Sequence, residues 1–304
     1  MTPPIDFAKL SGSGNDFICI DNRDGRLDEA LFPPDGASRL ARTLCPRGPG
    51  VGADGVILAV QPTDASAADV RARFLEPDGS EAELCGNGSA CFTRWVIRNR
   101  WVRGKEVRIE TPSGVARGRE ASDGYVHVCV PEPHDLQTDI EIATPDGTRW
   151  TMDFAVTGVP HAVVFVDDVE AVDVARWGAA IRHHERFAPR GVNVNFTQVL
   201  GPGRLAVRTF EFGVEGETLA CGTGSVTATL MAARRFGWPA DYLCAGEAVH
   251  VRVRSGDDLK VHFLMVEGGI IEKVCLESRV RFVYTGRLHP DLAARALGGG
   301  DVQH

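Results

Sequence analysis

Cys85-Gly-Asn-Gly-Ser89 and Cys221-Gly-Thr-Gly-Ser225 are two copies of one cysteine motif. Each copy follows an acidic, strand-like stretch and precedes a helix-like run, so the copies share their context as well as their residues. Aromatic residues match as well, at eleven positions before each cysteine (Phe74 and Phe210) and at sixteen or seventeen after it (Trp101 and Trp238). The pattern predicts a duplicated half-domain.

The small residues that follow each cysteine predict a helix N-terminus with exposed backbone N–H groups. Apolar residues then recur at helical spacing: Cys91, Phe92, Trp95 and Val96 in the first copy, and Val226, Leu230 and Ala233 in the second. Gly104 and the run Gly237-Trp-Pro239 are predicted to end these helices. The positive end of a helix dipole lowers the pKa of a thiol from its ordinary ~8.5 and attracts a ligand carboxylate. We therefore predict two thiols that can serve as base or acid.

Two other interpretations of the motif carry less weight. A single Cys-Gly turn would favour a buried structural cysteine, but two copies in matched contexts favour function. Neither motif has a second cysteine or histidine at the paired spacing of zinc ligands, since Cys91 follows Cys85 after five residues. We expect no metal and no cofactor.

The composition is that of an ordinary enzyme of 304 residues, with 43% hydrophobic residues and 33 basic against 41 acidic side chains. A net charge of -8 without a basic patch argues against nucleic acid and against an anionic membrane surface. The start, Met1-Thr-Pro-Pro-Ile5, lacks a basic region followed by an apolar stretch, so we expect a cytoplasmic protein. Eight cysteines are too few for a disulfide scaffold, and we expect free thiols.

Turn signals divide the chain into short β-branched runs with few helices. The strands that we predict are 17–21, 55–60, 107–110, 127–130, 162–166 and 249–253. The turn-rich Pro131-Glu-Pro133-His-Asp135 is the predicted linker. We therefore predict an N-terminal half of residues 1–132, completed by 279–304, and a C-terminal half of residues 133–278. The tail after Leu297 is predicted to be disordered.

The chain resembles the diaminopimelate epimerase family along nearly its whole length. The matching stretches are Ser11-Gly-Ser-Gly-Asn-Asp-Phe17, Gly50-Val-Gly-Ala-Asp-Gly55, Asp78-Gly-Ser-Glu-Ala-Glu-Leu-Cys-Gly-Asn-Gly88, Gly158-Val-Pro-His161, Gly191-Val-Asn-Val-Asn-Phe196 and Gly216-Glu-Thr-Leu-Ala-Cys-Gly-Thr-Gly224. The resemblance implies an α/β fold of two pseudosymmetric domains, each a curved β-sheet or barrel wrapped around a central helix. It also implies inversion of an amino-acid α-carbon without pyridoxal phosphate.

The resemblance also implies the site residues. Cys85 and Cys221 act as acid and base on opposite faces of the substrate, and His161 and Glu211 tune or deprotonate them, although the sequence does not say which partner serves which thiol. The implied substrate-binding residues are Asn15, Glu76, Gly86, Asn87, Asn193, Phe212, Gly222 and Thr223. The partner is a small-molecule amino acid, and a homodimer is an assembly that the sequence leaves undecided.

Departures from the family pattern concern the far end of diaminopimelate. Phe212 stands where the family has the arginine of Glu-Arg-Gly, expected to pair with the distal carboxylate; Glu76 and Val159 each replace an asparagine. An anionic group without its partner costs ~3–5 kcal/mol in a closed site. Ala90 replaces a common arginine, and we have no account of that change.

Several interpretations of function follow. We prefer a racemase for another free amino acid with an apolar, aromatic or basic side chain, which Phe212 would contact and Glu76 would attract. The alternative is a genuine diaminopimelate epimerase in which another residue, such as Arg47 or Arg73, supplies the missing cation. Two further alternatives keep the fold: an isomerase that moves double bonds, and a non-catalytic module that senses oxidation through Cys85 and Cys221.

Overall fold

The segments around the two cysteine motifs repeat one order of strands and helices in the computed structural model. The structure describes residues 4–121, 124–130, 132–244 and 246–298. The chain divides into two compact units: unit 1 holds the described residues up to Val126 and from Val280 onward, and unit 2 holds His127–Arg279. The domain limits at 132 and 278 stay predictions, and Pro131 of the predicted linker and the tail beyond Gly298 lie outside the described residues.

Unit 1 is built from strands and helices of both chain ends. Its strands are β1 (Asp6–Gly12), β2 (Asn15–Asp21), β3 (Gly55–Val60), β4 (Val70–Leu75), β5 (Glu81–Ala82), β6 (Glu106–Thr111) and β7 (Gly114–Glu120). Its helices are α1 (Asp28–Leu31), α2 (Gly36–Leu44), α3 (Gly86–Arg98) and α7 (Pro290–Leu297).

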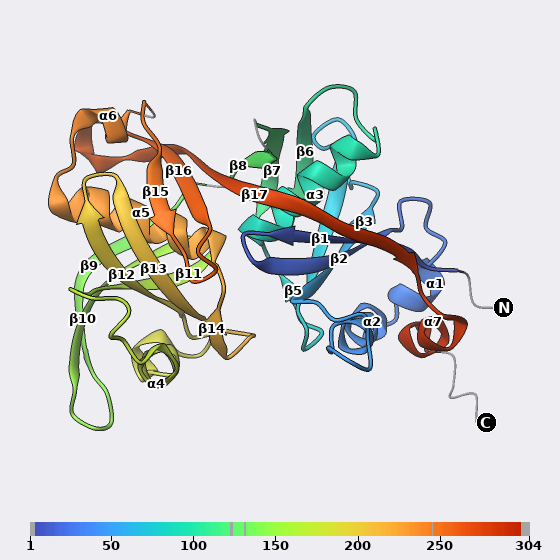
Figure 1. Cartoon of the computed structure of the whole chain (residues 1–304), viewed down its shortest axis with the longest axis horizontal. Helices are drawn as coiled ribbons and strands as arrows, with labels where there is room; N and C mark the ends of the chain where they lie inside the picture. The colour runs from blue at the N-terminus through green and yellow to red at the C-terminus, as the bar shows by residue number, and fades with distance from the viewer. Residues whose placement is uncertain (1–3, 122–123, 131, 245, 299–304) are drawn as a thin grey trace. The chain divides into compact units, whose positions relative to one another are not determined.

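Unit 2 is continuous in sequence. Its strands are β9 (His134–Ala143), β10 (Arg149–Thr157), β11 (Val159–Phe165), β12 (Asn193–Gly201), β13 (Arg204–Glu211), β14 (Gly216–Thr218), β15 (Val249–Arg252) and β16 (Asp258–Met265). Its helices are α4 (Val174–Arg182), η1 (Glu185–Phe187), α5 (Gly222–Phe236), α6 (Ala240–Leu243) and η2 (Glu267–Gly269). The strands β8 (Tyr125–Cys129) and β17 (Ile271–Arg287) carry the chain between the units (Figure 1).

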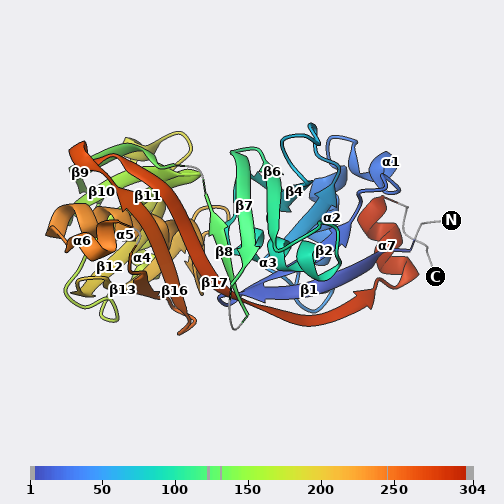
Figure 2. The same ribbon diagram turned by 90° about the horizontal axis from the view of Figure 1, so that it is seen from above.

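The strand pairings of unit 1 recur in unit 2. In unit 1, β2 and β3 are parallel, β3 and β4 antiparallel, β4 and β6 parallel, and β6 and β7 antiparallel. Figure 2 shows β6 and β7 side by side. In unit 2, β11, β12, β13, β15 and β16 repeat this series in the same order. The short strands β5 and β14 lie antiparallel to β4 and β13, just before each cysteine. The pseudosymmetric α/β fold predicted from the sequence is therefore confirmed.

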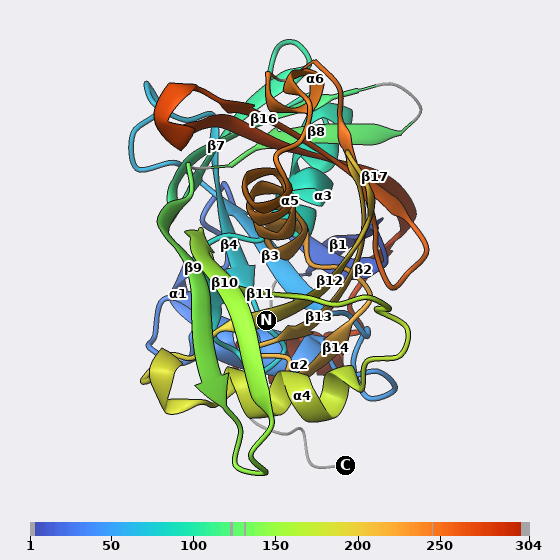
Figure 3. The same ribbon diagram turned by 90° about the vertical axis from the view of Figure 1, so that its left-hand side faces the viewer.

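Each unit wraps its strands around one helix. In unit 1, α3 packs against β1, β2, β4, β6 and β7; in unit 2, α5 packs against β10–β13, β15 and β16. Figure 3 shows α5 nearly end-on among the strands of its unit. Every residue from Gly222 to Ala233 of α5 is buried. A helix buried on all sides needs small or apolar residues around its whole circumference, which this helix has.

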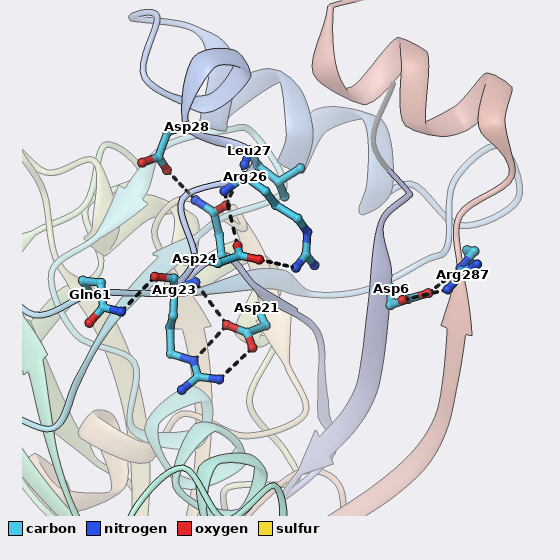
Figure 4. Close-up of polar contacts among 10 residues, drawn as sticks. Asp6, Asp21, Arg23, Asp24, Arg26, Leu27, Asp28, Gln61 and Arg287 are labelled. Carbon is cyan, nitrogen blue, oxygen red and sulfur yellow. Dashed lines mark hydrogen bonds and ion pairs between the residues drawn. The ribbon is translucent and has the colours of Figure 1, made fainter. Parts of the chain in front are cut away.

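Outer helices cover the opposite face of each sheet. In unit 1, Leu40 and Leu44 of α2 share a core with Val56 and Leu58 of β3, and α7 also packs against α2. In unit 2, α4 contributes Val174 and Ile181 to the corresponding core. The outer edge of unit 1 is tied by side chains as well, since Arg287 of β17 pairs with Asp6 of β1 (Figure 4).

The helix ends agree with the sequence in one copy and differ in the other. Gly237 ends α5 in the left-handed conformation, as predicted, with φ of 57°. In the first copy, α3 ends at Arg98, before the predicted stop at Gly104, because Arg100 adopts a positive φ of 57°. The expectation of free thiols is wrong for one pair, since Cys129 and Cys275 form a disulfide. Among the described residues, no helix has the length and apolarity needed to cross a membrane.

Candidate active site

The two motif cysteines adopt the same backbone geometry at the start of their helices. Cys85 is the N-cap of α3, with φ and ψ of -129° and 114°, and Cys221 is the N-cap of α5, with -119° and 112°. In each case the sulfur accepts the backbone N–H of the second glycine of the motif, at 3.3 Å from Gly88 and 3.3 Å from Gly224. Each thiol therefore caps its helix, and the two halves position their cysteines alike.

Packing explains why the motif needs its second glycine. A Cβ on Gly88 would lie 2.9 Å from the Phe74 ring and 3.1 Å from the Cys85 sulfur. A Cβ on Gly224 would lie 2.2 Å from Asn195 Oδ1 and 3.1 Å from the Cys221 sulfur. Any larger residue would push the N-cap thiol or the strand side chain below it out of place.

The pKa of Cys221 is raised, in contrast to the sequence prediction. Burial of the thiol raises the pKa well above its ordinary value, and the charge and hydrogen bond of the Glu211 carboxylate raise it further. The hydrogen bonds from Thr223 and Gly224 act in the opposite direction and are weaker. Loss of water around the sulfur thus outweighs the helix terminus, and Cys221 is a thiol in this structure.

A chain of hydrogen bonds leads from Cys221 to a buried histidine. The Cys221 sulfur lies 3.6 Å from Thr223 Oγ1, which lies 3.0 Å from Nε2 of His161. Asn195 donates its Nδ2 to Nδ1 of His161 at 3.2 Å. Since Nδ1 accepts, the neutral imidazole carries its proton on Nε2 and donates it to Thr223.

The amide of Asn195 is oriented by bonds on both sides. Its Nδ2 donates to the carbonyl of Ala162 at 2.9 Å, and its Oδ1 accepts the Thr209 hydroxyl at 3.0 Å. Burial lowers the pKa of His161 to about 3, so the imidazole stays neutral at physiological pH. Sequence reasoning missed Asn195, although its separation of two from Asn193 puts both on one face of a strand.

Asn193 and Phe212 adjoin this group in unit 2. Asn193 pairs with His161 in the parallel register of β11 and β12, and its Oδ1 accepts the backbone N–H of Phe212 at 3.0 Å. Two guanidinium groups flank the Phe212 ring, with Arg182 at 5.2 Å and Arg190 at 5.6 Å from the ring centroid. Arg182 also bonds to Glu215, and Arg190 lies in the loop between η1 and β12.

The remaining predicted residues belong to unit 1. Cys85 is half-buried, and Asn87, the second residue of α3, donates its Nδ2 to Oδ1 of Asn15 at 3.1 Å. Glu76 opens the turn after β4, where its backbone N–H donates to the carbonyl of Ser80. The structure thus groups Cys85, Asn15, Glu76, Gly86 and Asn87 in unit 1, and Cys221, His161, Glu211, Asn193, Phe212, Gly222 and Thr223 in unit 2.

The two arginines proposed as replacements for the missing family arginine are already engaged. Arg47 binds Asp16 and Asp54, at 2.9 and 3.0 Å. Arg73 forms bonds from two nitrogens to Glu81, the shortest at 2.7 Å. Both guanidinium groups therefore have carboxylate partners within unit 1.

Solved structures share the fold. A hydroxyproline epimerase from Agrobacterium vitis, solved with trans-4-OH-L-proline, superimposes with a TM-score of 0.73 at 18% identity, over 99% of this chain and 96% of that one. A probable proline racemase from Agrobacterium radiobacter K84 gives 0.71 at 20% identity, over 94% and 93%. A Bacillus anthracis phenazine biosynthesis protein of the PhzF family gives 0.69 at 14% identity, over 94% and 99%. At these identities the similarity concerns the fold.

Sequence comparisons decide the family. The family model for diaminopimelate epimerase matches residues 7–129 and 154–263. The diaminopimelate epimerase of Aquifex aeolicus (strain VF5) is 40% identical over 95% of this chain and 99% of its own length, and that of Chlorobaculum tepidum is 35% identical over 92% and 99%. The protein is thus an isomerase of the amino-acid racemase and epimerase class. More specifically, the chain belongs to the diaminopimelate epimerase family.

Proposed function

We propose that this protein inverts the α-carbon of a free amino acid with Cys85 and Cys221 as its acid–base pair. The observation that carries the proposal is the matched N-cap geometry of the two thiols at the ends of equivalent buried helices. One thiolate removes the α-proton from one face, and the other thiol donates a proton to the opposite face. The proton removed and the proton delivered belong to different sulfurs, so inversion accompanies exchange with solvent.

The carbanion forms beside the substrate carboxylate and needs fixed donors. A helix leaves its first N–H groups without acceptors inside the helix, and in this protein those groups follow each cysteine directly. We propose that the amides around Gly86 and Gly222, with Asn15, Asn87 and Asn193, hold the carboxylate and the amino group. Such preorganised donors stabilise developing charge more effectively than water does.

We propose that Glu211 is the proton acceptor for Cys221. The carboxylate already bonds to this buried thiol, whose raised pKa disfavours a thiolate without a nearby base. His161, neutral and bonded to Thr223, orients the hydroxyl beside the same sulfur. In this role His161 positions Thr223 and holds the first turn of α5.

Diaminopimelate is the substrate that the curated relatives favour, because the relatives named here carry the name diaminopimelate epimerase at 35% and 40% identity over almost their whole length. Arg190 supplies a further argument. Its guanidinium lies 5.6 Å from the ring of Phe212, the residue that stands where the family arginine is expected. We propose that Arg190, rather than Arg47 or Arg73, meets the distal carboxylate across that ring.

A second candidate is an amino acid without a distal carboxylate and with a basic or aromatic side chain. It is favoured by the aromatic ring of Phe212 and by the carboxylate of Glu76, which would repel an anionic group and attract a cation. A cytoplasmic location and a homodimer also remain predictions.

The test is an NMR screen of the reduced protein in deuterium oxide with diaminopimelate stereoisomers and a panel of other amino acids. Loss of the α-proton signal of diaminopimelate, reduced at least tenfold in Arg190→Gln, supports the first candidate. Exchange confined to another amino acid establishes the second, and Phe212→Arg should then gain activity on diaminopimelate.

The same screen tests the other classes of function. Absence of exchange with every amino acid under reducing conditions would overturn the epimerase proposal and favour a redox-sensing module. Deuterium at a position other than the α-carbon would favour an isomerase that moves double bonds.

A further inference from the structure

A second group of cysteine and histidine side chains lies in unit 2, outside the proposed active site. Cys129 of β8 and Cys275 of β17 are joined by a disulfide, and His127 lies two residues before Cys129. The ligand atoms of these three residues all lie within 4.8 Å of one another. Residues two apart on a strand point to one face, so His127 and Cys129 face the same side of the sheet.

Strand register places a fourth side chain, that of His262, beside this group. In the antiparallel ladder of β16 and β17, His262 lies directly opposite Cys275. The rings of His262 and His127 approach each other, with centroids 5.4 Å apart. Three neighbouring strands therefore bring two cysteines and two histidines to one face, although the four residues are widely separated in the sequence.

The carboxylate of Glu277 lies next to one of the two histidines, His262. Nε2 of His262 lies 3.6 Å from Oε2 of Glu277, which leaves Nδ1 of that ring for another partner. Histidines that bind metals commonly donate their second nitrogen to a carboxylate, which fixes the ring orientation. Of the four side chains, Cys275 is buried and the other three are half-buried, so an ion can reach them from solvent.

We propose that His127, Cys129, His262 and Cys275 bind one zinc ion when the disulfide is reduced. A thiol reductant supplies two electrons and two protons, breaks the sulfur–sulfur bond and is itself oxidised to a disulfide. Zinc then displaces the two thiol protons and binds two thiolates and two neutral imidazoles, a common structural set. With Zn–S near 2.3 Å and Zn–N near 2.0 Å, the tetrahedral ligand atoms lie roughly 3–4 Å apart. The ligand atoms of His127, Cys129 and Cys275 lie within 4.8 Å of one another, and His262, which is not in that group, must rotate toward them to complete the site.

The spacing of cysteines and histidines around the two motifs predicts no metal, because neither motif has a second ligand at paired spacing in the chain. The four proposed ligands include His127-Val-Cys129 and two residues on different strands, so only the ladder brings them together. The disulfide and the zinc site exclude each other, since both use the two sulfurs. Each would cross-link β8 to β17, the strands that carry the chain between units.

The test measures the zinc bound by the full chain after its disulfide has been reduced with a phosphine. A phosphine is used because a thiol reductant would compete with the protein for zinc. The protein is loaded with zinc sulfate and desalted, and zinc and protein are quantified; cobalt substitution adds a visible thiolate-to-metal charge-transfer band. The double variant Cys85→Ser/Cys221→Ser keeps the proposed zinc ligands and removes the motif thiols. The double variant Cys129→Ser/Cys275→Ser removes the two proposed cysteine ligands and keeps the motif thiols. We expect about one zinc per chain in the wild type and in the first double variant, and loss of bound zinc in the second.

The single variants His127→Asn and His262→Asn keep both sulfurs and control for misfolding of the serine variant. Each should lose stoichiometric zinc while keeping the wild-type circular dichroism spectrum. Two results would overturn the proposal: zinc retained by Cys129→Ser/Cys275→Ser, or no stoichiometric zinc on reduced Cys85→Ser/Cys221→Ser. Because Cys129 and Cys275 lie outside the proposed catalytic set, α-proton exchange by Cys129→Ser/Cys275→Ser reports on the proposed function separately.

Discussion

The strand side chains below the cysteine motif are apolar in unit 1 and polar in unit 2, although the two scaffolds match. Ala82 and Thr218 each lie three residues before a cysteine, and the ladders lead from them to equivalent positions on the next strands. In unit 1 these positions hold Phe74 and Ile57, and Phe17 of β2 lies opposite Gly55, two residues before Ile57. In unit 2 they hold Thr209 and Asn195, and His161 of β11 lies opposite Asn193, two residues before Asn195.

The difference shows how a duplicated fold separates packing from chemistry. Phe17, Ile57 and Phe74 are buried and apolar, so they fill space below Cys85. Thr209, Asn195 and His161 are equally buried but form a continuous hydrogen-bonded series that ends at Thr223 beside Cys221. At these positions one half therefore supports its helix with apolar side chains, and the other supports it with a polar network whose members depend on one another.

Replacement of the cysteines should give the largest effect. Cys85→Ser and Cys221→Ser should each lower kcat/KM for inversion by ~10³-fold or more, because either loss removes one member of the acid–base pair. Each variant should keep α-proton exchange with solvent deuterium for one stereoisomer only, and the two variants should keep opposite isomers. The comparison fails if both variants exchange the same isomer.

His161 should make unit 2 sensitive to acid. Burial lowers its pKa from 6.5 to about 3, so the unfolded chain takes up the proton first as the pH falls. The contribution of neutral His161 to the free energy of unfolding is complete above pH 6.5. This contribution is lost as the pH falls toward 3, and the total loss is about 5 kcal/mol. Urea unfolding at pH 7, 5 and 4 should show a shallower pH dependence in His161→Asn. Phe17→Leu, at the equivalent position of unit 1, should keep the wild-type slope.

The two turn carboxylates offer a further contrast. Glu76 follows Leu75, which pairs with Glu81, and Glu211 follows Phe210, which pairs with Glu217, so the two glutamates occupy equivalent positions. Glu211→Gln should lower kcat by ~100-fold because Cys221 loses its proton acceptor. Glu76→Gln should change mainly KM, as expected for a residue that contacts the substrate side chain. Equal losses of kcat in both variants would show instead that each thiol uses its own carboxylate.

The smallest expected effect concerns the second glycine of each motif. Gly224→Ala should destabilise the protein by about 2–3 kcal/mol, because the new Cβ meets an Asn195 amide fixed by bonds on both sides. Gly88→Ala should cost about 1 kcal/mol, because the Phe74 ring can shift and alanine favours the helix. Chemical denaturation of both variants measures the difference, and a larger loss in Gly88→Ala would contradict it.

Local signals predicted the central helices, their cysteine N-termini and six of the strands, because small residues and alternation act within a few positions. Strand 55–60 matches β3, for example. Sequence distance from each cysteine was a less accurate guide to which residues of the two copies are structurally equivalent. Phe74 and Phe210 are equally distant from their cysteines, yet Thr209 is the ladder equivalent of Phe74. The segment between the paired residues Phe210 and Glu217 is one residue longer than the segment between the paired residues Leu75 and Glu81. Asn195 and the pairing of Cys129 with Cys275 depend on register between strands, which spacing along the chain does not reveal.

The pairing of β1 with β17 has a consequence for the order of events during protein synthesis. β1 emerges from the ribosome before the other strands, whereas its partner β17, which places Arg287 opposite Asp6, emerges after all of them. Unit 2 has its whole sequence, His127–Arg279, available before unit 1 can close its sheet. Until β17 has been synthesised, the edge of β1 that β17 will occupy is exposed to other chains. A nascent chain that stops at Arg279, before the residues of β17 that pair with β1, should therefore require chaperone protection of β1, even when unit 2 has already formed.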